Sequence, residues 1–234
     1  MSFDGLLLVD KPIGWSSFDV VAKVRGILQK EYLLEHEEKQ KIKVGHTGTL
    51  DPLATGLMIV IVGSYCKRAS EFSKLNKTYE VQMKLGMTST TGDEEGEKTK
   101  VQSLEFKVEE IEGVLEDFLG ESMQTPPAFS AIKINGTRAY KLAREGKEVV
   151  IEPRKIKIAE IKLDKYDFPL VNFTVDVSSG TYVRSLVEDI GKKLDTGAYI
   201  TSLRRTEIDK YSIKDAISVQ NNEQKLSSKV FSLD

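Results

Sequence analysis

Hydrophobic and polar positions along the chain follow a strand-like pattern in some segments and a helical period in others. Apolar runs and strict alternation, which are typical of strands, predict strands at residues 5–9, 57–62, 79–85, 156–163, 171–177 and 199–206. Apolar residues spaced by three and four predict helices at about 16–30, 108–119, 137–145 and 183–194. The order contains no regular βα repeat, and Asn135-Gly136 is typical of a hairpin turn. The pattern predicts an α+β fold with a largely antiparallel sheet.

The same pattern indicates one main domain. Neither an internal repeat nor a low-complexity linker interrupts the chain, and residues 1–210 carry the predicted strands and helices. The segment 30–43 is rich in charge and is expected to be solvated. Residues 211–234 are expected to form a short polar tail.

Composition and charge narrow the class of protein. Apolar residues make up 40% of the 234, enough for a core, and the net charge of −2 gives no global sign of a nucleic-acid partner. Residues 93–121 hold 11 acidic and 3 basic side chains, interpreted as turns and the solvent face of a helix. Residues 133–157 hold eight basic and three acidic side chains, which suits a phosphate-facing surface but equally a solvated face.

Cysteine and histidine are too scarce for several kinds of chemistry. One cysteine and two histidines cannot build a disulfide framework or a Cys/His zinc site, so we expect metal-free chemistry in a reducing compartment. The longest apolar run, at 57–62, is far shorter than the roughly 20 residues of a membrane helix. Asp4 stands where a signal peptide carries positive charge. These features predict a cytoplasmic protein without a membrane segment.

The richest turn of the sequence runs from residue 45 to 56 and reads GHTGTLDPLATG. Its three glycines permit tight backbone turns, and Pro52 disfavours helical backbone at Asp51, so this carboxylate is expected on an irregular loop between apolar strands. Asp and Thr side chains also often bond backbone amides in turns, which is an equally good interpretation. His46, in the same turn, has no second histidine nearby and is not a metal site.

Two further positions invite a choice between function and structure. Arg184 falls in the first turn of a predicted helix, where the positive end of the helix dipole disfavours a cation unless a carboxylate or phosphate compensates its charge. The alternative is an ordinary surface arginine whose aliphatic part covers apolar neighbours. Tyr79 begins a strand, where tyrosines usually serve the core. No glycine turn is followed by Gly-Lys-Ser/Thr, so a nucleotide-triphosphate loop is absent from the sequence.

Several motifs together resemble the TruB-type tRNA pseudouridine synthases, which convert uridine 55 in the T loop of tRNA to pseudouridine. The resemblance covers roughly residues 5–210, in the family's order. It is carried by LVDKPIGWSS (8–17), GHTGTLDPLATG (45–56), KTY (77–79), QTPPAFSA (124–131), SGTYVR (179–184) and LRRT (203–206). It implies the pseudouridine synthase fold, a mixed, mainly antiparallel sheet with flanking helices.

The resemblance also implies roles for individual residues. Asp51 matches the nucleophilic aspartate, Tyr79 the residue that lies against the target base, and Arg184 the partner of the aspartate. The segment 11–14 is expected to support the loop that carries Asp51.

Other matched positions belong to substrate binding. His46, Tyr182, Leu203 and again Tyr79 match positions that contact the RNA. The implied substrate is the T stem-loop of tRNA, bound by a monomer without a protein partner, and the isomerisation needs no cofactor and no metal. Many bacterial relatives continue into an RNA-binding PUA domain, so the chain is expected to be a short form without it.

Two alternatives stay open at this stage. One is a synthase of the same fold that acts on another uridine, either alone or guided by an RNA. The other is an RNA-binding folding factor that opens and recloses tRNA, with catalysis incidental. The retained Asp51 and Arg184 favour an enzyme, because binding alone does not require a buried carboxylate paired with arginine.

Overall fold

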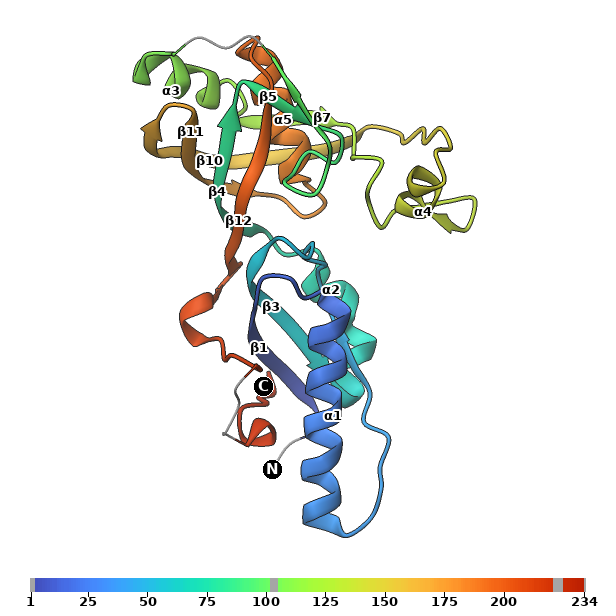
Figure 1. Cartoon of the computed structure of the whole chain (residues 1–234). Coiled ribbons are helices and arrows are strands. Elements are labelled where there is room, and N and C mark those ends of the chain that lie inside the picture. Colours follow the sequence, from blue (N-terminus) through green and yellow to red (C-terminus); the bar gives the residue numbers. More distant parts are fainter. Residues whose placement is uncertain (1–2, 102–104, 221–224, 234) are drawn as a thin grey trace. The chain divides into compact units, whose positions relative to one another are not determined.

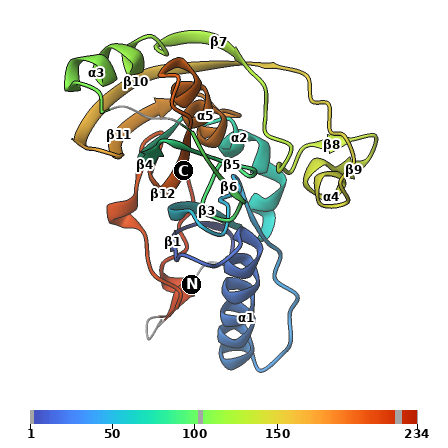
Figure 2. The same ribbon diagram turned by 45° about the horizontal axis from the view of Figure 1, so that its top comes forward.

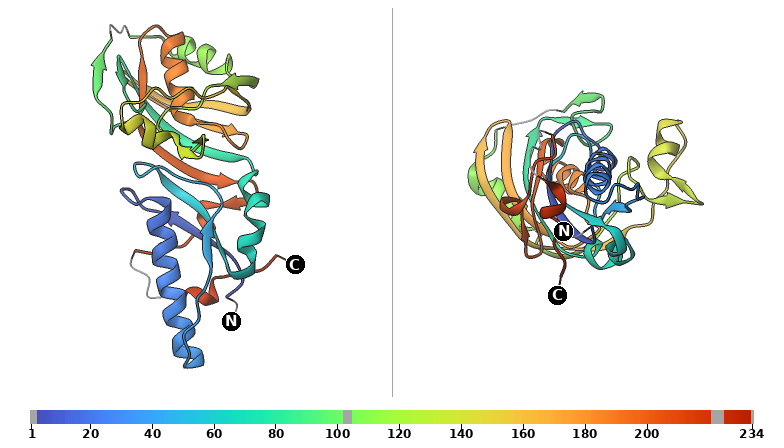
Figure 3. Two further views of the ribbon diagram at one scale, coloured as in Figure 1. Left: turned by 90° about the vertical axis from the view of Figure 1, so that its right-hand side faces the viewer. Right: turned by 90° about the horizontal axis from the view of Figure 1, so that it is seen from below.

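The computed structural model describes residues 3–101, 105–220 and 225–233, and the chain divides into two compact units (Figure 1). Unit 1 comprises residues 1–78 and 204–234, whereas unit 2 is the continuous stretch 79–203. Both ends of the chain therefore belong to unit 1 (Figure 3).

The elements of unit 1 come from the two ends of the chain. They are β1 (Gly5–Lys11), α1 (Ser17–His36), β2 (Val44–His46), β3 (Thr55–Val62), the 3-10 helix η1 (Gly63–Arg68), α2 (Ala69–Ser73), β13 (Tyr211–Ser212) and the 3-10 helices η2 (Ile213–Asp215) and η3 (Leu226–Ser228). Strands β4 (Lys77–Leu85) and β12 (Ala198–Ile208) each begin or end in it and continue into unit 2.

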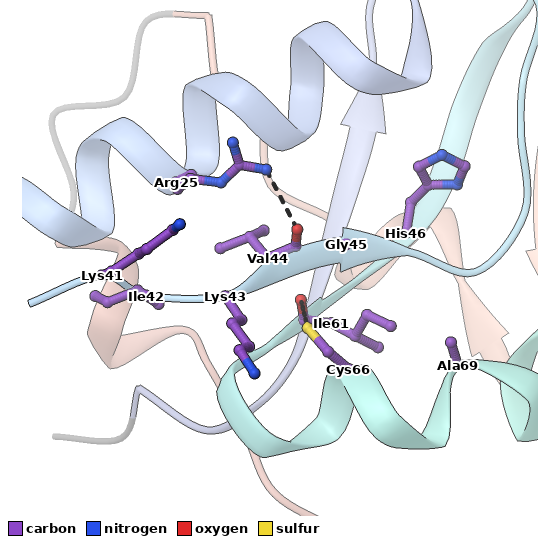
Figure 4. A pocket seen from close by; sticks show the side chains of 10 residues that line it. All are labelled: Arg25, Lys41, Ile42, Lys43, Val44, Gly45, His46, Ile61, Cys66 and Ala69. Atoms are coloured by element: carbon purple, nitrogen blue, oxygen red, sulfur yellow. Dashed lines mark hydrogen bonds between the residues drawn. The ribbon is translucent and has the colours of Figure 1, made fainter.

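Strand β3 is the centre of the unit 1 sheet. It pairs with β1 in antiparallel register, from Gly5↔Val62 to Lys11↔Gly56. Its other edge is shared, because β12 pairs in parallel at its start and β2 pairs antiparallel at its end. Figure 4 shows α1 and the η1–α2 segment on opposite sides of β2. Both faces of this sheet are covered, which explains why the apolar runs in β1 and β3 are continuous rather than alternating.

The segment after residue 211 is part of unit 1. Tyr211, Val219, Leu226 and Val230 are buried in it. Leu6 and Phe231 exchange main-chain hydrogen bonds of 2.8 and 3.0 Å. The last stretch of the chain thus lines the outer side of β1, where it stabilises an otherwise open strand edge.

Unit 2 contains the remaining elements. They are β5 (Met87–Ser89), β6 (Lys98–Lys100), α3 (Val108–Glu116), β7 (Gly120–Gln124), β8 (Lys133–Ile134), β9 (Thr137–Arg138), α4 (Ala139–Arg144), β10 (Arg154–Asp167), β11 (Leu170–Val177) and α5 (Val183–Lys193).

The main sheet of unit 2 has the order β12-β4-β11-β10-β7. The pairs β10/β11 and β10/β7 are antiparallel. Helix α3 packs on β10 and touches α5, whose apolar side is buried. Between β7 and β10 the chain leaves the sheet to form the hairpin β8–β9 and helix α4, which project from it (Figure 2). The hairpin turn is Asn135-Gly136, with φ values of 50° and 84°, as the sequence predicted.

The α+β class with mostly antiparallel pairing is confirmed, and each predicted helix and strand overlaps an observed one. The predicted end of the first helix, at about residue 30, is wrong, because α1 continues to His36, whereas the segment 30–43 is largely exposed, as predicted. The start of α1 is as predicted: Ser16 accepts a hydrogen bond from the Asp19 N–H and Asp19 reciprocates, which makes a capping box. No described helix combines the length and apolar character that crossing a membrane requires.

Candidate active site

Asp51 lies on an irregular loop between β2 and β3, as the glycines and Pro52 predicted. The residue before it is clamped by Ser17, at the start of α1. The Leu50 N–H donates to the Ser17 hydroxyl (2.8 Å), and the same hydroxyl donates to the Leu50 carbonyl (3.0 Å). After it, the Ala54 N–H donates to the Asp51 carbonyl (3.0 Å). The main chain on both sides of the carboxylate is thereby fixed.

Lys11 supports this loop from within unit 1. Its ammonium group is fully buried and donates to the carbonyls of Pro12 (3.0 Å), Trp15 (2.6 Å) and Pro52 (3.3 Å). The Gly14 N–H adds a second hydrogen bond to the Pro52 carbonyl (2.8 Å). The segment 11–15 therefore holds the residue next to Asp51, as the motif led us to expect. Burial lowers the pKa of Lys11 to about 8, and the charge of Asp51 opposes that shift.

Arg205 fixes the other side of the loop. It is 1% exposed, its Nε–H donates to the Leu57 carbonyl (2.7 Å), and its guanidinium reaches the Gly48 carbonyl (3.1 Å). Gly56 makes this approach possible: at φ 106° it has left-handed backbone, and a Cβ there would overlap the Arg205 carbonyl oxygen. Arg205 belongs to the LRRT motif, but no pattern in the sequence predicted this role for it.

The neighbouring Arg204 ties β12 to β1. Its guanidinium makes a two-pronged pair with Asp10, with N–O distances of 3.2 and 2.8 Å, and also reaches the Thr55 hydroxyl (3.3 Å). Both residues are about one-third exposed, so this pair mainly fixes register between strands. The motifs at residues 10, 55 and 204 thus meet in one network.

His46 ends β2, directly before the loop. It is half-buried, and its Nδ1 has no hydrogen-bond partner among the described residues. Burial, with a smaller effect from the charge of Arg205, lowers the pKa of His46, so the ring is neutral at pH 7. A neutral ring is suited to stacking and hydrogen bonding rather than to holding an anion by charge.

Arg184 is buried in unit 2, not a surface arginine. It is 6% exposed and donates to the carbonyls of Thr91 (3.0 Å) and Phe129 (2.8 Å). Its guanidinium also lies 3.7 Å from the carboxylate of Asp93. The interpretation of the acidic stretch 93–121 as turns and a solvent-facing helix is therefore wrong for Asp93, which is 3% exposed because it faces this buried cation.

The start of α5 is held by the QTPPAFSA segment. The Gln124 side chain accepts from the Tyr182 N–H (2.8 Å) and donates to the Tyr182 carbonyl (3.1 Å), so it grips both main-chain groups of that residue. One turn later the Ser185 hydroxyl donates to the Thr125 carbonyl (3.0 Å). With the bond from Arg184 to Phe129, the segment makes contacts to three of the first residues of the helix.

The predicted site residues fall into two groups. Asp51 and His46 belong to unit 1, whereas Tyr79, Tyr182, Arg184 and Leu203 belong to unit 2. Tyr79 on β4 and Leu203 on β12 are 8% and 7% exposed, as strand residues of a core commonly are. The pairing of Arg184 with Asp51 stays a prediction from the motifs. Among the described residues, no cluster of three or more His, Cys, Asp or Glu side chains could hold a metal ion.

Comparison with known proteins places these motifs in a family. The model described as "TruB family pseudouridylate synthase (N terminal domain)" matches residues 34–183. The model described as "tRNA pseudouridylate synthase B C-terminal domain" matches residues 184–228.

Individual relatives agree with the family models. The chain is 40% identical to tRNA pseudouridine synthase B of Endomicrobium trichonymphae, over 95% of this chain and 92% of the relative. It is 41% identical to the protein of that name from Parabacteroides distasonis, over 98% of this chain and 96% of the relative. A solved Cbf5-Nop10-Gar1 complex contains a chain with 27% identity and a TM-score of 0.67, over 92% of this chain and 52% of that one. The chain belongs to the TruB family of pseudouridylate synthases.

Proposed function

We propose that this chain converts uridine 55 in the T loop of tRNA to pseudouridine, with Asp51 as the nucleophile. The observation that carries the proposal is the loop of Asp51, whose main chain is fixed by Ser17, Lys11 and Arg205 in a member of a pseudouridylate synthase family. A carboxylate held in one place by buried groups is what a reaction at a single ribose carbon needs.

The chemistry agrees with the residues that the chain supplies. Isomerisation breaks the bond between N1 and C1′, turns the base and joins C1′ to C5, so no atom is added and no electron is transferred. An ionised carboxylate is sufficient to start it, by adding to C1′, by adding to C6, or by removing a ribose proton to give a glycal. We therefore expect no cofactor. These three routes share the requirement for a charged Asp51.

Arg184 is proposed to favour the ionised form of Asp51 in the working enzyme. An arginine beside a carboxylate lowers the pKa of that carboxylate and offsets the effect of burial. The contacts of Arg184 with Thr91, Asp93 and Phe129 support this proposal, because they fix the position and plane of the guanidinium.

Substrate binding is proposed to use Tyr79, Tyr182, Leu203 and His46. A uridine inside a folded loop must be turned out before its ribose can be attacked. Stacking of a side chain on a base contributes about 1 to 3 kcal/mol, comparable with the cost of unstacking that base. Tyr79 and Leu203 are of the aromatic and apolar types that serve this purpose.

We further propose that the chain acts as a monomer in a reducing compartment. The solved relative is a complex of Cbf5 with Nop10 and Gar1, so the rival is an enzyme that works only in such an assembly. These two hypotheses predict different results with the purified chain, because a self-sufficient enzyme modifies tRNA with no other component.

The experiment is to map pseudouridine in an unmodified tRNA transcript after incubation with the purified chain alone. We expect one new pseudouridine, at position 55, and none in a transcript that carries cytidine there. Modification at another uridine would assign a different target. No modification at saturating protein would remove the proposal of a self-sufficient tRNA enzyme.

A further inference from the structure

Unit 1 contains a pocket of about 490 Å³ beside strand β2 (Figure 4). Its neutral side includes Gly45, Ile61 and Cys66, and its charged side is formed by Arg25, Lys41 and Lys43. These side chains come from α1, the segment before β2, β2 itself, β3 and η1. A pocket of this volume accommodates a small organic ligand.

The charge of the pocket is one-sided. Three cationic side chains line it, and none of its described lining residues is an aspartate or glutamate. Arg25 is half-buried, and its contact with a carbonyl, that of Val44, is long at 3.4 Å. Lys41 and Lys43 are exposed, so their side chains are available at the rim. Cations gathered around a concave surface with neutral walls attract an anion.

Gly45 gives a second, independent indication of a ligand. Its φ lies outside the left-handed region, so its backbone does not require glycine. A Cβ there would meet the Ile61 side chain at 3.5 and 3.6 Å, which is ordinary van der Waals contact. Glycine within a strand often marks a bulge, a tight bend, or a place where a ligand or another backbone approaches closely, and the pairing of Gly45 with Ile61 contains no bulge.

We propose that this pocket binds a nucleotide of the substrate RNA next to the target uridine, with its phosphate among Arg25, Lys41 and Lys43 and its sugar or base over Gly45. The inference rests on the proposed function. Because Asp51 is six residues from Gly45, their Cα atoms are at most about 22 Å apart. A strand whose target uridine lies at Asp51 therefore passes within reach of the pocket.

The only cysteine of the chain reports on the pocket directly. Cys66 is half-buried, and burial raises the pKa of its thiol, so its reaction with the uncharged reagent N-ethylmaleimide is slow and easily timed. A T stem-loop oligonucleotide at saturation should slow this alkylation at least fivefold. An unchanged rate at saturating RNA would overturn the proposal.

Uridine monophosphate tests whether the pocket binds a nucleotide of an RNA strand or a free nucleotide. If the pocket serves the RNA strand, the free nucleotide protects Cys66 only at concentrations far above those at which the stem-loop does. Protection by the free nucleotide with no protection by the stem-loop would assign the pocket to a small molecule and overturn the inference.

Substitutions test the same pocket by affinity. Gly45→Ala should fold with an unchanged thermal midpoint and bind the stem-loop about tenfold more weakly, because the methyl group occupies the space above the strand. Gly26→Ala is the matched control, since its Cβ would meet nothing within 4 Å and it does not line the pocket. A folded Gly45→Ala that binds as tightly as the parent chain would contradict the proposal.

The lysines provide a test that does not depend on Gly45. Each of Lys41→Gln and Lys43→Gln should reduce the slope of log affinity against log salt by about 0.7, the value of one phosphate contact on a single strand. Lys39→Gln, exposed in the same segment but outside the pocket, should leave the slope unchanged. Equal slopes in all three variants would overturn the proposal.

The outcome for the pocket is separable from the outcome for the function. If the parent chain forms pseudouridine, but RNA does not protect Cys66 and the pocket variants bind RNA as the parent does, only this inference is contradicted. RNA protection of Cys66 without any pseudouridine would contradict only the proposed reaction.

Discussion

Buried cations, not carboxylates, hold the main chain around Asp51. Lys11 and Arg205 are at most 1% exposed, and their described hydrogen bonds all go to carbonyl oxygens. Carbonyl acceptors do not titrate, so the part of the loop's support that comes from Lys11 and Arg205 depends on the charge of these cations and not on that of their partners. Removing a buried donor leaves its carbonyl partners unsatisfied, at a cost of about 1 to 3 kcal/mol each.

Asp51, the proposed nucleophile, is the first residue to test. Asp51→Asn should abolish turnover while changing tRNA affinity by less than about tenfold, or 1.4 kcal/mol, because the amide keeps the shape but loses the charge. Single-turnover assays and a binding titration measure the two quantities. Appreciable pseudouridine formation by this variant would remove Asp51 from its proposed role, whereas loss of affinity alone would indicate a binding role.

Lys77 provides a prediction about stability and pH. It is 8% exposed and donates to the carbonyls of Ser73 (2.8 Å) and Leu75, and burial lowers the pKa of Lys77 to about 8. Between pH 8 and 10.5 the unfolded chain therefore binds more protons than the folded one, and stability rises with pH by up to about 1.4 kcal/mol per unit. Below pH 8 the destabilisation is fully present.

The measurement is urea unfolding of the parent chain and of Lys77→Met between pH 7 and 9.5. The free energy of unfolding of the parent, relative to that of the variant, should increase as the pH rises above 8. The exposed neighbour Lys74 is the control, because Lys74→Met should follow the parent at each pH. Parallel curves for the parent and Lys77→Met would show that burial does not perturb this lysine.

At the scale of elements, the first turn of α5 depends on a segment about sixty residues earlier in the chain. Tyr182, at the N-cap, lacks a capping side chain of its own, and Gln124 binds both of its main-chain groups. The helix that carries Arg184 therefore starts where β7 ends. This gives the QTPPAFSA motif a physical role as the support of α5.

Gln124→Glu should make activity depend on pH in a way that a merely structural change does not. An ionised carboxylate still accepts from the Tyr182 N–H but repels the Tyr182 carbonyl, so we expect about a tenfold lower rate than the parent at neutral pH. Burial raises the pKa of a glutamate, and once protonated it donates again. The ratio of variant to parent rate in single-turnover assays should therefore rise as the pH falls.

Two control variants are compared with Gln124→Glu. Gln124→Met removes both hydrogen bonds and should be slow with a ratio that is flat in pH. Gln82→Glu changes a part-buried glutamine of the same unit, bound to Asn172 and Thr201 and remote in sequence from α5, and should follow the parent. A flat ratio for Gln124→Glu would leave this residue without a positioning role.

Sequence patterns found the elements because their information is local. The capping box at Ser16 and the turn at Asn135 depend on residues within three positions of each other. The extra turns of α1 depend on distant partners: Glu31 accepts from the N–H groups of Leu226 (2.7 Å) and Ser227 (2.8 Å). No periodicity encodes such a contact.

The candidate site shows the same division. The loop of Asp51 was predictable because Gly and Pro restrict their own backbone. The burial of Asp93 was not, since its cationic partner Arg184 is 91 residues away and the segment reads as uniformly acidic. The role of Arg205 was not predictable for the same reason: its acceptors, the carbonyls of Gly48 and Leu57, lie on the other segment of unit 1.

At the scale of the whole molecule, charge is segregated rather than balanced. The hairpin β8–β9 and α4 carry Lys133, Arg138, Lys141 and Arg144, all exposed, on a chain whose net charge is −2. RNA meets only local charge within a Debye length of about 8 to 10 Å, so the net value does not govern binding. A projecting basic hairpin and helix are suited to following a phosphate backbone.

RNA affinity should therefore fall steeply with salt. Lys133→Gln and Lys141→Gln should each reduce the slope of log affinity against log salt by about 0.7 to 0.9, depending on whether the contacted RNA is single- or double-stranded. Fluorescence anisotropy with a labelled T stem-loop measures this slope. Lys162→Gln, exposed on β10 of the same unit, is the control and should leave it unchanged. A parent affinity that is flat between low and moderate salt would contradict a phosphate-binding surface.

The division of unit 1 between the two ends of the chain has a consequence for its synthesis. A ribosome that has finished residue 78 must add the 125 residues of unit 2, which takes roughly 6 to 25 s, before the first residue of the second segment is made. During that interval the apolar face of β1 and β3 lacks Ile208 and Tyr211, and β1 lacks Phe231 along its edge. Unit 2, one continuous stretch, is complete first. On each round of translation Arg205 is therefore made long after the loop of Asp51 that it supports, so the unit that carries the proposed nucleophile is completed after unit 2.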